Sequence, residues 1–264
     1  MNEGPNLKNL LFQHRMNTIQ SIKAVLFDLD GTLIQTEVLK ADSYAMAISE
    51  LTQGAVDKKQ VSDIFNQFVG LSRTEVVQGL AKHYYKELST HLSSDDLETI
   101  GEKLIEKRLA LYREILDNTE LLSKHFCTYT LGLFHRLKRE NYTLVLATMS
   151  HLPEAKKVTE AIGIYDQFDL VLTRDDVANG KPAPDIYKKA KEHFGLNSEQ
   201  CLVIEDSPNG IMAAQNAGMP VFAVTNSITR KSVHDCKLLD PRFIVDDLTQ
   251  LETVVCSYLE SRTD

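Results

Sequence analysis

The sequence lacks the features that mark several protein classes. Its four cysteines (Cys127, Cys201, Cys236 and Cys256) lie far apart with no CxxC pair, which argues against a zinc site and a disulfide framework. No uninterrupted apolar run approaches the roughly 20 residues that a membrane-spanning helix needs. Basic residues are the minority, 29 against 37 acidic ones, and the formal charge of -8 argues against a nucleic-acid footprint. We therefore expect a soluble protein with no nucleic-acid or membrane partner.

The composition is that of an ordinary globular chain. Of the 264 residues, 43% are hydrophobic and 25% are charged, which excludes disordered and collagen-like proteins. At roughly 150 residues per domain, the length predicts one large or two modest domains. The first twenty residues hold no long apolar stretch followed by a small-residue cleavage site, so we expect no signal peptide. The sequence predicts a cytoplasmic monomer with an N-terminal extension over residues 1–20.

Short apolar runs predict the strands of a sheet. The first run, Lys23–Asp28, ends in a carboxylate followed by Gly31, as a buried strand that emerges into a loop would. Later strands are predicted at Tyr142–Ala147, Asp169–Leu172, Cys201–Ile204, Val221–Val224 and Phe243–Val245. Helical spacing predicts helices at Glu154–Ile162, Ala183–Phe194, Asn209–Ala217 and Leu248–Leu259. Strands that alternate with helices indicate a parallel sheet covered on both faces.

The segment between the first two strands has a different character. From residue 38 to 118, apolar residues recur at helical spacing, and Arg108 interrupts one of these stripes. Ser72 and Glu75 have the spacing of a capping box at a helix start. The fold class predicted is α/β: a core of residues 21–37 and 119–264, with an all-helical insert over 38–118.

Two carboxylates, Asp28 and Asp30, follow the first strand directly. Ligands bind outside the carboxyl ends of strands in open α/β sheets, so one carboxylate there can attack phosphorus while the other moves protons. Gly31 permits the turn that follows. The alternative is a solvated turn, since Asp and Gly are common in loops. A chance match to Asp28, Asp30, Gly31 and Thr32 has odds on the order of one in a thousand, which favours the functional interpretation.

Polar residues also follow other strands. Thr148, with the backbone near Met149, is placed to grip phosphate oxygens, although Ser150 competes for this role and either hydroxyl could simply cap a helix. Lys181 directly precedes two prolines that rigidify the Gly180–Asp185 segment, and a cation there could bridge nucleophile and phosphate; the alternative is an exposed loop lysine.

Glu205 and Asp206 end a further strand. Hard oxygen ligands at a strand end suit Mg²⁺, while the alternative is capping of the helix that begins near Asn209. Each signal is modest by itself. The occurrence of all these polar motifs at successive strand ends of one sheet favours phosphate chemistry.

Taken together, these motifs resemble the haloacid dehalogenase-like hydrolase superfamily, in the branch of β-phosphoglucomutase and many small phosphatases. The resemblance covers residues 22–247 and includes the Gly70–Arg73 segment, which is similar to the cap loop of that branch. It implies a Rossmann-like core with an inserted all-α cap. Two features depart from the branch: Leu121–Phe126 stands where a Pro-Gly turn is common, and Lys40 stands where the mutase has a hinge histidine.

The resemblance implies a role for each motif. Asp28 is the nucleophile, and Asp30 protonates the leaving oxygen and then activates water. Mg²⁺ is held by Asp28, the backbone carbonyl of Asp30 and Asp206, with Glu205 as an orienting or water-mediated neighbour. Thr148, the backbone near Met149, and Lys181 bind the phosphoryl group.

The cap is expected to close over the site and to contact the rest of the substrate. Arg73, Lys40 and Arg108 are the candidate contacts, although each charged side chain could instead lie on a solvated face. The leading hypothesis is a Mg²⁺-dependent phosphatase of a small phosphorylated metabolite, favouring a sugar phosphate. The alternatives are a phosphomutase of the β-phosphoglucomutase type and a catalytically silent protein that binds phosphorylated ligands.

Overall fold

The computed structural model describes residues 21–68 and 71–262, so the predicted extension over 1–20 lies outside the described residues. Its sheet has six parallel strands in the order β3-β2-β1-β4-β5-β6. Their bounds are β1 Ala24–Phe27, β2 Thr143–Ala147, β3 Leu170–Leu172, β4 Cys201–Glu205, β5 Val221–Val224 and β6 Ile244–Val245. β1 lies between β2 and β4, with Ala24 level with both Thr143 and Cys201. The predicted α/β class with a parallel sheet is confirmed.

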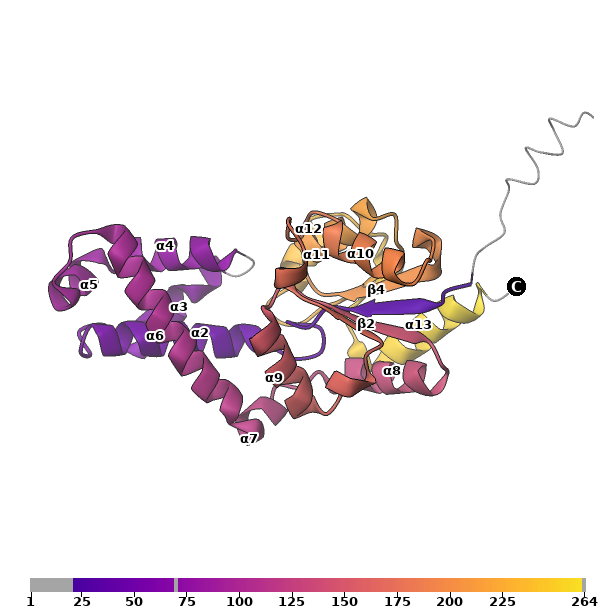
Figure 1. The fold of residues 1–264 in the computed structure, drawn as a ribbon, viewed down its shortest axis with the longest axis horizontal. Helices are drawn as coiled ribbons and strands as arrows, with labels where there is room; N and C mark the ends of the chain where they lie inside the picture. Colours follow the sequence, from indigo (N-terminus) through magenta and orange to yellow (C-terminus); the bar gives the residue numbers. More distant parts are fainter. Residues whose placement is uncertain (1–20, 69–70, 263–264) are drawn as a thin grey trace, which may run out of the picture.

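Alternation along the strands divides the core into two layers, because successive side chains point to opposite faces. Val25 and Phe27 pack on one face, which is covered by α8 Thr128–Arg139, α9 Leu152–Ile162 and α13 Leu251–Glu260. Ala24 and Leu26 pack on the other, under α10 Asp185–His193, α11 Pro208–Asn216 and α12 Arg230–Asp235. Figure 1 shows these two helical layers on either side of the strands.

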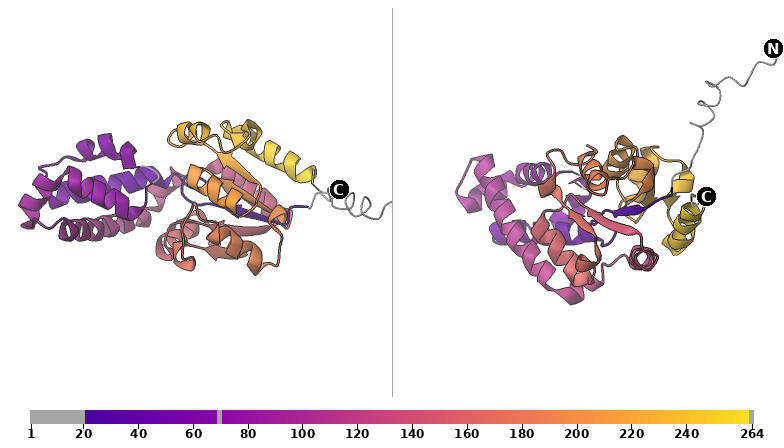
Figure 2. Two further views of the ribbon diagram at one scale, coloured as in Figure 1. Left: turned by 90° about the horizontal axis from the view of Figure 1, so that it is seen from above. Right: turned by 45° about the vertical axis from the view of Figure 1, so that its right-hand side comes forward.

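An all-helical cap is inserted between β1 and β2. Its helices are α2 Thr36–Leu51, α3 Lys58–Phe65, α4 Arg73–His83, α5 Tyr85–Leu92 and α6 Leu97–Asp117, and α7 Thr119–Ser123 leads back to the core. They share a hydrophobic cluster of their own and form a separate body at one end of the molecule (Figure 2). The capping box of α4 is present: Ser72 and Glu75 each accept a hydrogen bond from the other's backbone N–H. The boundaries at 38 and 118 stay a prediction.

Two chain segments connect cap and core, and they pair with each other. Ile34 and Phe126 form an antiparallel bridge. The N–H of Gln35 donates to the carbonyl of His125 (2.8 Å), and the N–H of Cys127 donates to that of Leu33 (2.9 Å). The return segment that lacks a Pro-Gly turn therefore completes a two-stranded hinge.

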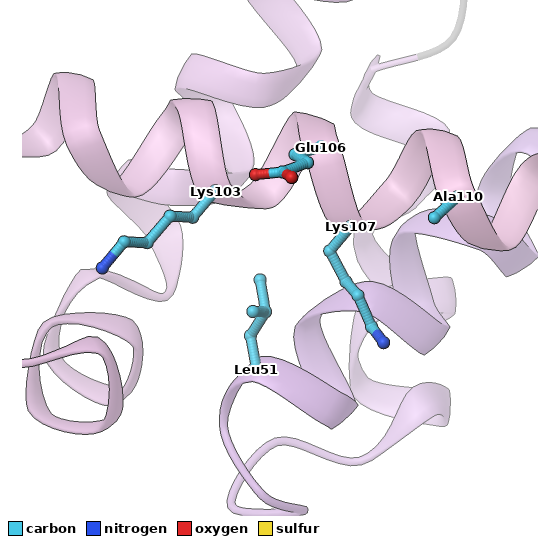
Figure 3. Close-up of a pocket in the computed structure, with 5 residues that line it drawn as sticks. All are labelled: Leu51, Lys103, Glu106, Lys107 and Ala110. Carbon is cyan, nitrogen blue, oxygen red and sulfur yellow. The ribbon is translucent and has the colours of Figure 1, made fainter.

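Two further features lie away from the strand ends. Among the described helices, none is long and apolar enough to cross a membrane. A hollow of about 270 Å³ lies on the cap between Leu51 of α2 and Lys103, Glu106, Lys107 and Ala110 of α6 (Figure 3). Its residues belong to none of the predicted motifs.

Candidate active site

The predicted chemistry-bearing residues of the core meet at the carboxyl edge of the sheet. Asp28 follows β1, Thr148 follows β2, and Glu205 and Asp206 lie at the end of β4. Lys181 reaches the same point from the segment between β3 and α10. Because all the strands are parallel, residues that follow them gather at one edge.

Lys181 joins these strand ends. Its Nζ donates to Asp28 Oδ1 (2.7 Å), to Glu205 Oε1 (2.6 Å) and to the carbonyl of Ala147 (2.9 Å). The side chain is only 5% exposed. The alternative of an exposed loop lysine is therefore wrong, and the ammonium lies where it can neutralise an anion beside Asp28.

Glu205 is held by donors on both carboxylate oxygens. Oε1 accepts from Lys181 and from the Tyr187 hydroxyl (3.0 Å), and Oε2 accepts from the N–H groups of Asp206 (2.9 Å) and Ser207 (3.2 Å). A Cβ on Gly210 would lie 1.8 Å from Oε1, so only glycine fits there. Sequence reasoning missed Tyr187, for which no local signal exists, and it did not predict the close approach of Gly210 to Glu205.

Asp206 faces the turn that carries the first carboxylate pair. A Cβ on Gly31 would lie 1.9 Å from Asp206 Oδ2, and Gly31 has φ +82°. Glycine is thus required twice, for the backbone conformation and for the space beside the carboxylate. Burial, followed by the charges of Glu205 and Asp28, raises the pKa of Asp206 well above its ordinary value.

The three acids form a cluster that suits a divalent cation. Asp28, Glu205 and Asp206 each place a carboxylate oxygen within 4.8 Å of the others, and all three are buried. Burial raises the pKa of Asp28 to about 7, and Lys181 offsets part of this rise. Three acids beside one ammonium leave excess negative charge, and hard oxygen donors of this kind fit Mg²⁺.

Asp30 has a separate set of partners. Its Oδ1 accepts from Lys40 Nζ (3.0 Å) and from the Thr36 hydroxyl, and its Oδ2 accepts from the Ser150 hydroxyl (2.6 Å). Burial acts to raise the pKa of Asp30, but Lys40, Ser150 and Thr36 outweigh it and hold the pKa below its ordinary value. The two carboxylates on this turn thus have pKa values shifted in opposite directions, so they can take different roles in a reaction.

This arrangement agrees with comparisons to known proteins. A family model described as haloacid dehalogenase-like hydrolase matches residues 22–218. The chain belongs to this family. It is similar to the phosphoglycolate phosphatase of Salmonella typhi, with 28% identity over 244 residues that cover 89% of this chain and 93% of the relative. It is also similar to the phosphorylated carbohydrates phosphatase of Thermotoga maritima, with 26% identity over 78% of this chain and 87% of the relative.

A solved structure shares the fold of this haloacid dehalogenase-like hydrolase. The beta-phosphoglucomutase from Clostridium difficile aligns with a TM-score of 0.64 at 24% identity, over 91% of this chain and 97% of that chain. The family and the phosphatase relatives identify the protein as an enzyme, a phosphatase of small phosphorylated metabolites.

The phosphate-binding candidates of this hydrolase surround Lys181. Thr148 is fully buried, and its hydroxyl oxygen accepts from the N–H of Ser150 (3.0 Å). Met149 Sδ accepts from the backbone N–H of Lys181 (3.4 Å). Ser150, the competing hydroxyl, binds Asp30, so the two hydroxyls serve different groups.

The three cap candidates of the hydrolase lie in different surroundings. Lys40 reaches the site and pairs with Asp30 and with Glu37 (2.9 Å). Arg73 lies at the boundary with the core, where its Nη2 is 3.6 Å from Glu154 Oε1. Arg108 is 3% exposed and lies inside the cap. Their roles as substrate contacts stay predictions.

Proposed function

We propose that this phosphatase hydrolyses a small sugar phosphate, with Mg²⁺ as cofactor and through an aspartyl phosphate on Asp28. The observation that supports this proposal most strongly is the set of ion pairs at Lys181, whose ammonium contacts both Asp28 and Glu205. Asp30 has separate donors, among them Lys40. Bound Mg²⁺, held by Asp28, the backbone carbonyl of Asp30 and Asp206, would neutralise charge on the phosphoryl group. Glu205 orients Lys181 and the turn at Asp206.

The proposed reaction has two halves. A carboxylate oxygen of Asp28 attacks phosphorus, the ester P–O bond breaks, and Asp30 gives its proton to the leaving oxygen. Asp30 then takes a proton from water as that water attacks the aspartyl phosphate, which releases inorganic phosphate and restores both acids. The donors around Asp30 stabilise its carboxylate, the form that the second half requires.

The remaining site residues bind and position the phosphoryl group. Lys181 supplies a positive charge beside the attacking oxygen, and Thr148 with the backbone of Met149 supplies donors at the end of β2. Arg73, Lys40 and Arg108 are proposed to contact the substrate from the cap. Because Lys40 already pairs with Asp30, its contact would lie closest to the ester oxygen.

Lys40 also favours hydrolysis over the mutase reaction. A mutase must protect its aspartyl phosphate from water until a sugar phosphate returns. A charged lysine cannot accept a proton as neutral imidazole can, so it cannot take the acid/base role of a hinge histidine. We expect water to capture the intermediate.

A phosphate-release screen tests the proposal. Purified protein is assayed on a panel of phosphorylated metabolites, with Mg²⁺ and with excess EDTA. We expect Mg²⁺-dependent release of phosphate from sugar phosphates, and full activity in chelator would exclude the metal. Conversion of β-glucose 1-phosphate with a bisphosphate primer to glucose 6-phosphate, without phosphate release, would establish the mutase instead.

A further inference from the structure

An acid from the core meets two cap arginines where cap and core approach each other. Glu154 lies in the first turn of α9, four residues after Ser150, whose hydroxyl binds Asp30. Arg73, at the start of α4, places its Nη2 3.6 Å from Glu154 Oε1, and the Glu154 side chain is 12% exposed. Arg108 of α6 acts electrostatically on both residues. We call Arg73, Arg108 and Glu154 the boundary cluster.

Glu154 has an unfilled acceptor. Its Oε2 is buried and receives no hydrogen bond from any described residue. Its Oε1 faces Arg73 at a distance longer than a good hydrogen bond, so the ion pair leaves acceptor capacity on this oxygen too. Buried carboxylate oxygens are normally satisfied, so this oxygen, which lies where cap and core approach each other, still lacks a donor.

Arg108 has unused donors on the cap side. Its guanidinium carbon lies 4.3 Å from the ring centroid of Tyr112 and 4.9 Å from that of Tyr44, and its Nε donates to the Ser43 hydroxyl (3.0 Å). Among the described residues no carboxylate forms an ion pair with it. The aromatic rings fix the plane of the guanidinium without using its terminal N–H groups.

The cluster is close to the acid/base. Tyr112, which packs on Arg108, also experiences the charges of Lys40 and Asp30. A group bound between Glu154 and Arg108 would therefore belong to the leaving part of the substrate, beyond the ester oxygen that Asp30 protonates.

We propose that Glu154 is a specificity-determining residue that recognises a hydroxyl of the leaving group. The hydroxyl donates to Glu154 Oε2, and Arg108 donates to the same or the neighbouring hydroxyl. A hydroxyl both donates and accepts, whereas a carboxylate or a fully ionised phosphate cannot donate to Glu154. The inference rests on the proposed function and narrows it: the leaving group is polyhydroxylated, and Arg73 holds Glu154 in place.

Paired substrates test this inference. Steady-state kinetics of wild type and Glu154→Ala are measured on the best sugar phosphate of the screen and on p-nitrophenyl phosphate, whose leaving group has no other hydroxyl. We expect kcat/KM for the sugar phosphate to fall by about tenfold or more, because a site built for a hydroxyl loses most when that bond is lost. For p-nitrophenyl phosphate we expect a change of less than about twofold.

Two further variants separate recognition from folding. Glu154→Gln keeps one acceptor oxygen and should recover part of the sugar-phosphate activity. Glu160→Ala, on the exposed side of the same helix, should leave both substrates unchanged. Equal losses on both substrates, or no loss on either, would overturn the role of Glu154. A wild-type enzyme that cleaves p-nitrophenyl phosphate but no sugar phosphate would instead refute the proposed substrate, and with it the hydroxyl contact.

Discussion

Asp28 and Asp30 differ in proton affinity although one residue separates them. Asp28 lies among Glu205, Asp206 and Lys181, and burial dominates its raised pKa. Asp30 lies among three donors, which overcome the same burial. Burial and neighbouring donors therefore shift the pKa values of the two carboxylates in opposite directions.

Replacing the nucleophile should remove turnover without unfolding the protein. We expect Asp28→Asn to lower kcat by roughly three orders of magnitude or more, because the amide cannot form the aspartyl phosphate. Phosphate release and the circular dichroism spectrum measure the two effects. Asp30→Asn is the companion variant, because it lacks the base that activates water. A mass increase of one phosphoryl group on this variant would show that the aspartyl phosphate accumulates. Turnover by Asp28→Asn near the wild-type rate would refute the chemistry.

Gly31 offers a test of space around Asp206. Gly31→Ala would place a Cβ 1.9 Å from Asp206 Oδ2, whereas Gly163 has nearly the same φ, +81°, with nothing within 4 Å. Both alanine variants should lose about 1 kcal/mol or more of stability from the left-handed backbone. Only Gly31→Ala should also lose Mg²⁺-dependent activity. Kinetics and denaturant unfolding of the pair measure this, and equal activity in both variants would contradict it.

At the scale of elements, α2 couples cap and core. Thr36 and Lys40, on its first turns, both donate to the Asp30 carboxylate. Glu37 holds Lys40 from the same helix (2.9 Å). Any movement of the cap that shifts the start of α2 must therefore change the surroundings of Asp30.

The charge of Lys40 should be visible in the pH dependence of the reaction. Lys40 lowers the pKa of Asp30, so Lys40→Met should raise that pKa. Because Asp30 must hold a proton for the first half of the proposed reaction, the alkaline limb of the rate profile should move upward by about one pH unit. Lys59→Met, which removes an exposed cap lysine paired only with Asp63, should leave the limb in place. A pH–rate profile of kcat/KM measures both. An unmoved limb in Lys40→Met would show that the pair does not tune Asp30.

The elements of the core could be predicted because their signals are local. Each strand is a short apolar run, and every motif except that of Lys181 directly follows one, so the sequence predicts Asp28, Thr148 and Asp206 at one edge. The sequence pattern does not predict the core helices α8 and α12. The partners of Asp30 were not predictable either, because its contact with Ser150 spans 120 positions and depends on the packing of β2 against β1. Arg108 interrupted an apolar stripe in the sequence because aromatic rings enclose it within the cap.

Over the whole molecule, the acid cluster should make stability depend on pH and on metal. The pKa of Asp28, about 7, and the raised pKa of Asp206 mean that the metal-free fold holds protons that the unfolded chain releases. The contribution of Asp28 to stability is complete below about pH 4 and is lost as the pH rises through about 7, and the raised pKa of Asp206 acts in the same direction. We expect excess Mg²⁺ to raise Tm at pH 8 at least about 3 °C more than at pH 5.

Thermal unfolding with EDTA and with MgCl₂ at the two pH values measures this difference. Asp206→Asn is the matched variant, since it removes one acid of the cluster, and its Mg²⁺ effect should shrink at pH 8. The same Mg²⁺ gain at both pH values in the wild type would contradict the assignment of the acids to the cation.

The paired connectors have a mechanical consequence. A single linking strand can swivel about its bonds, but two antiparallel strands joined by backbone hydrogen bonds resist torsion and bend mainly across their width. We expect this pairing to restrict movement of the cap to bending about a single axis. We therefore expect the backbone of the connectors, and not the substrate, to determine where the start of α2 lies beside Asp30 in a closed state.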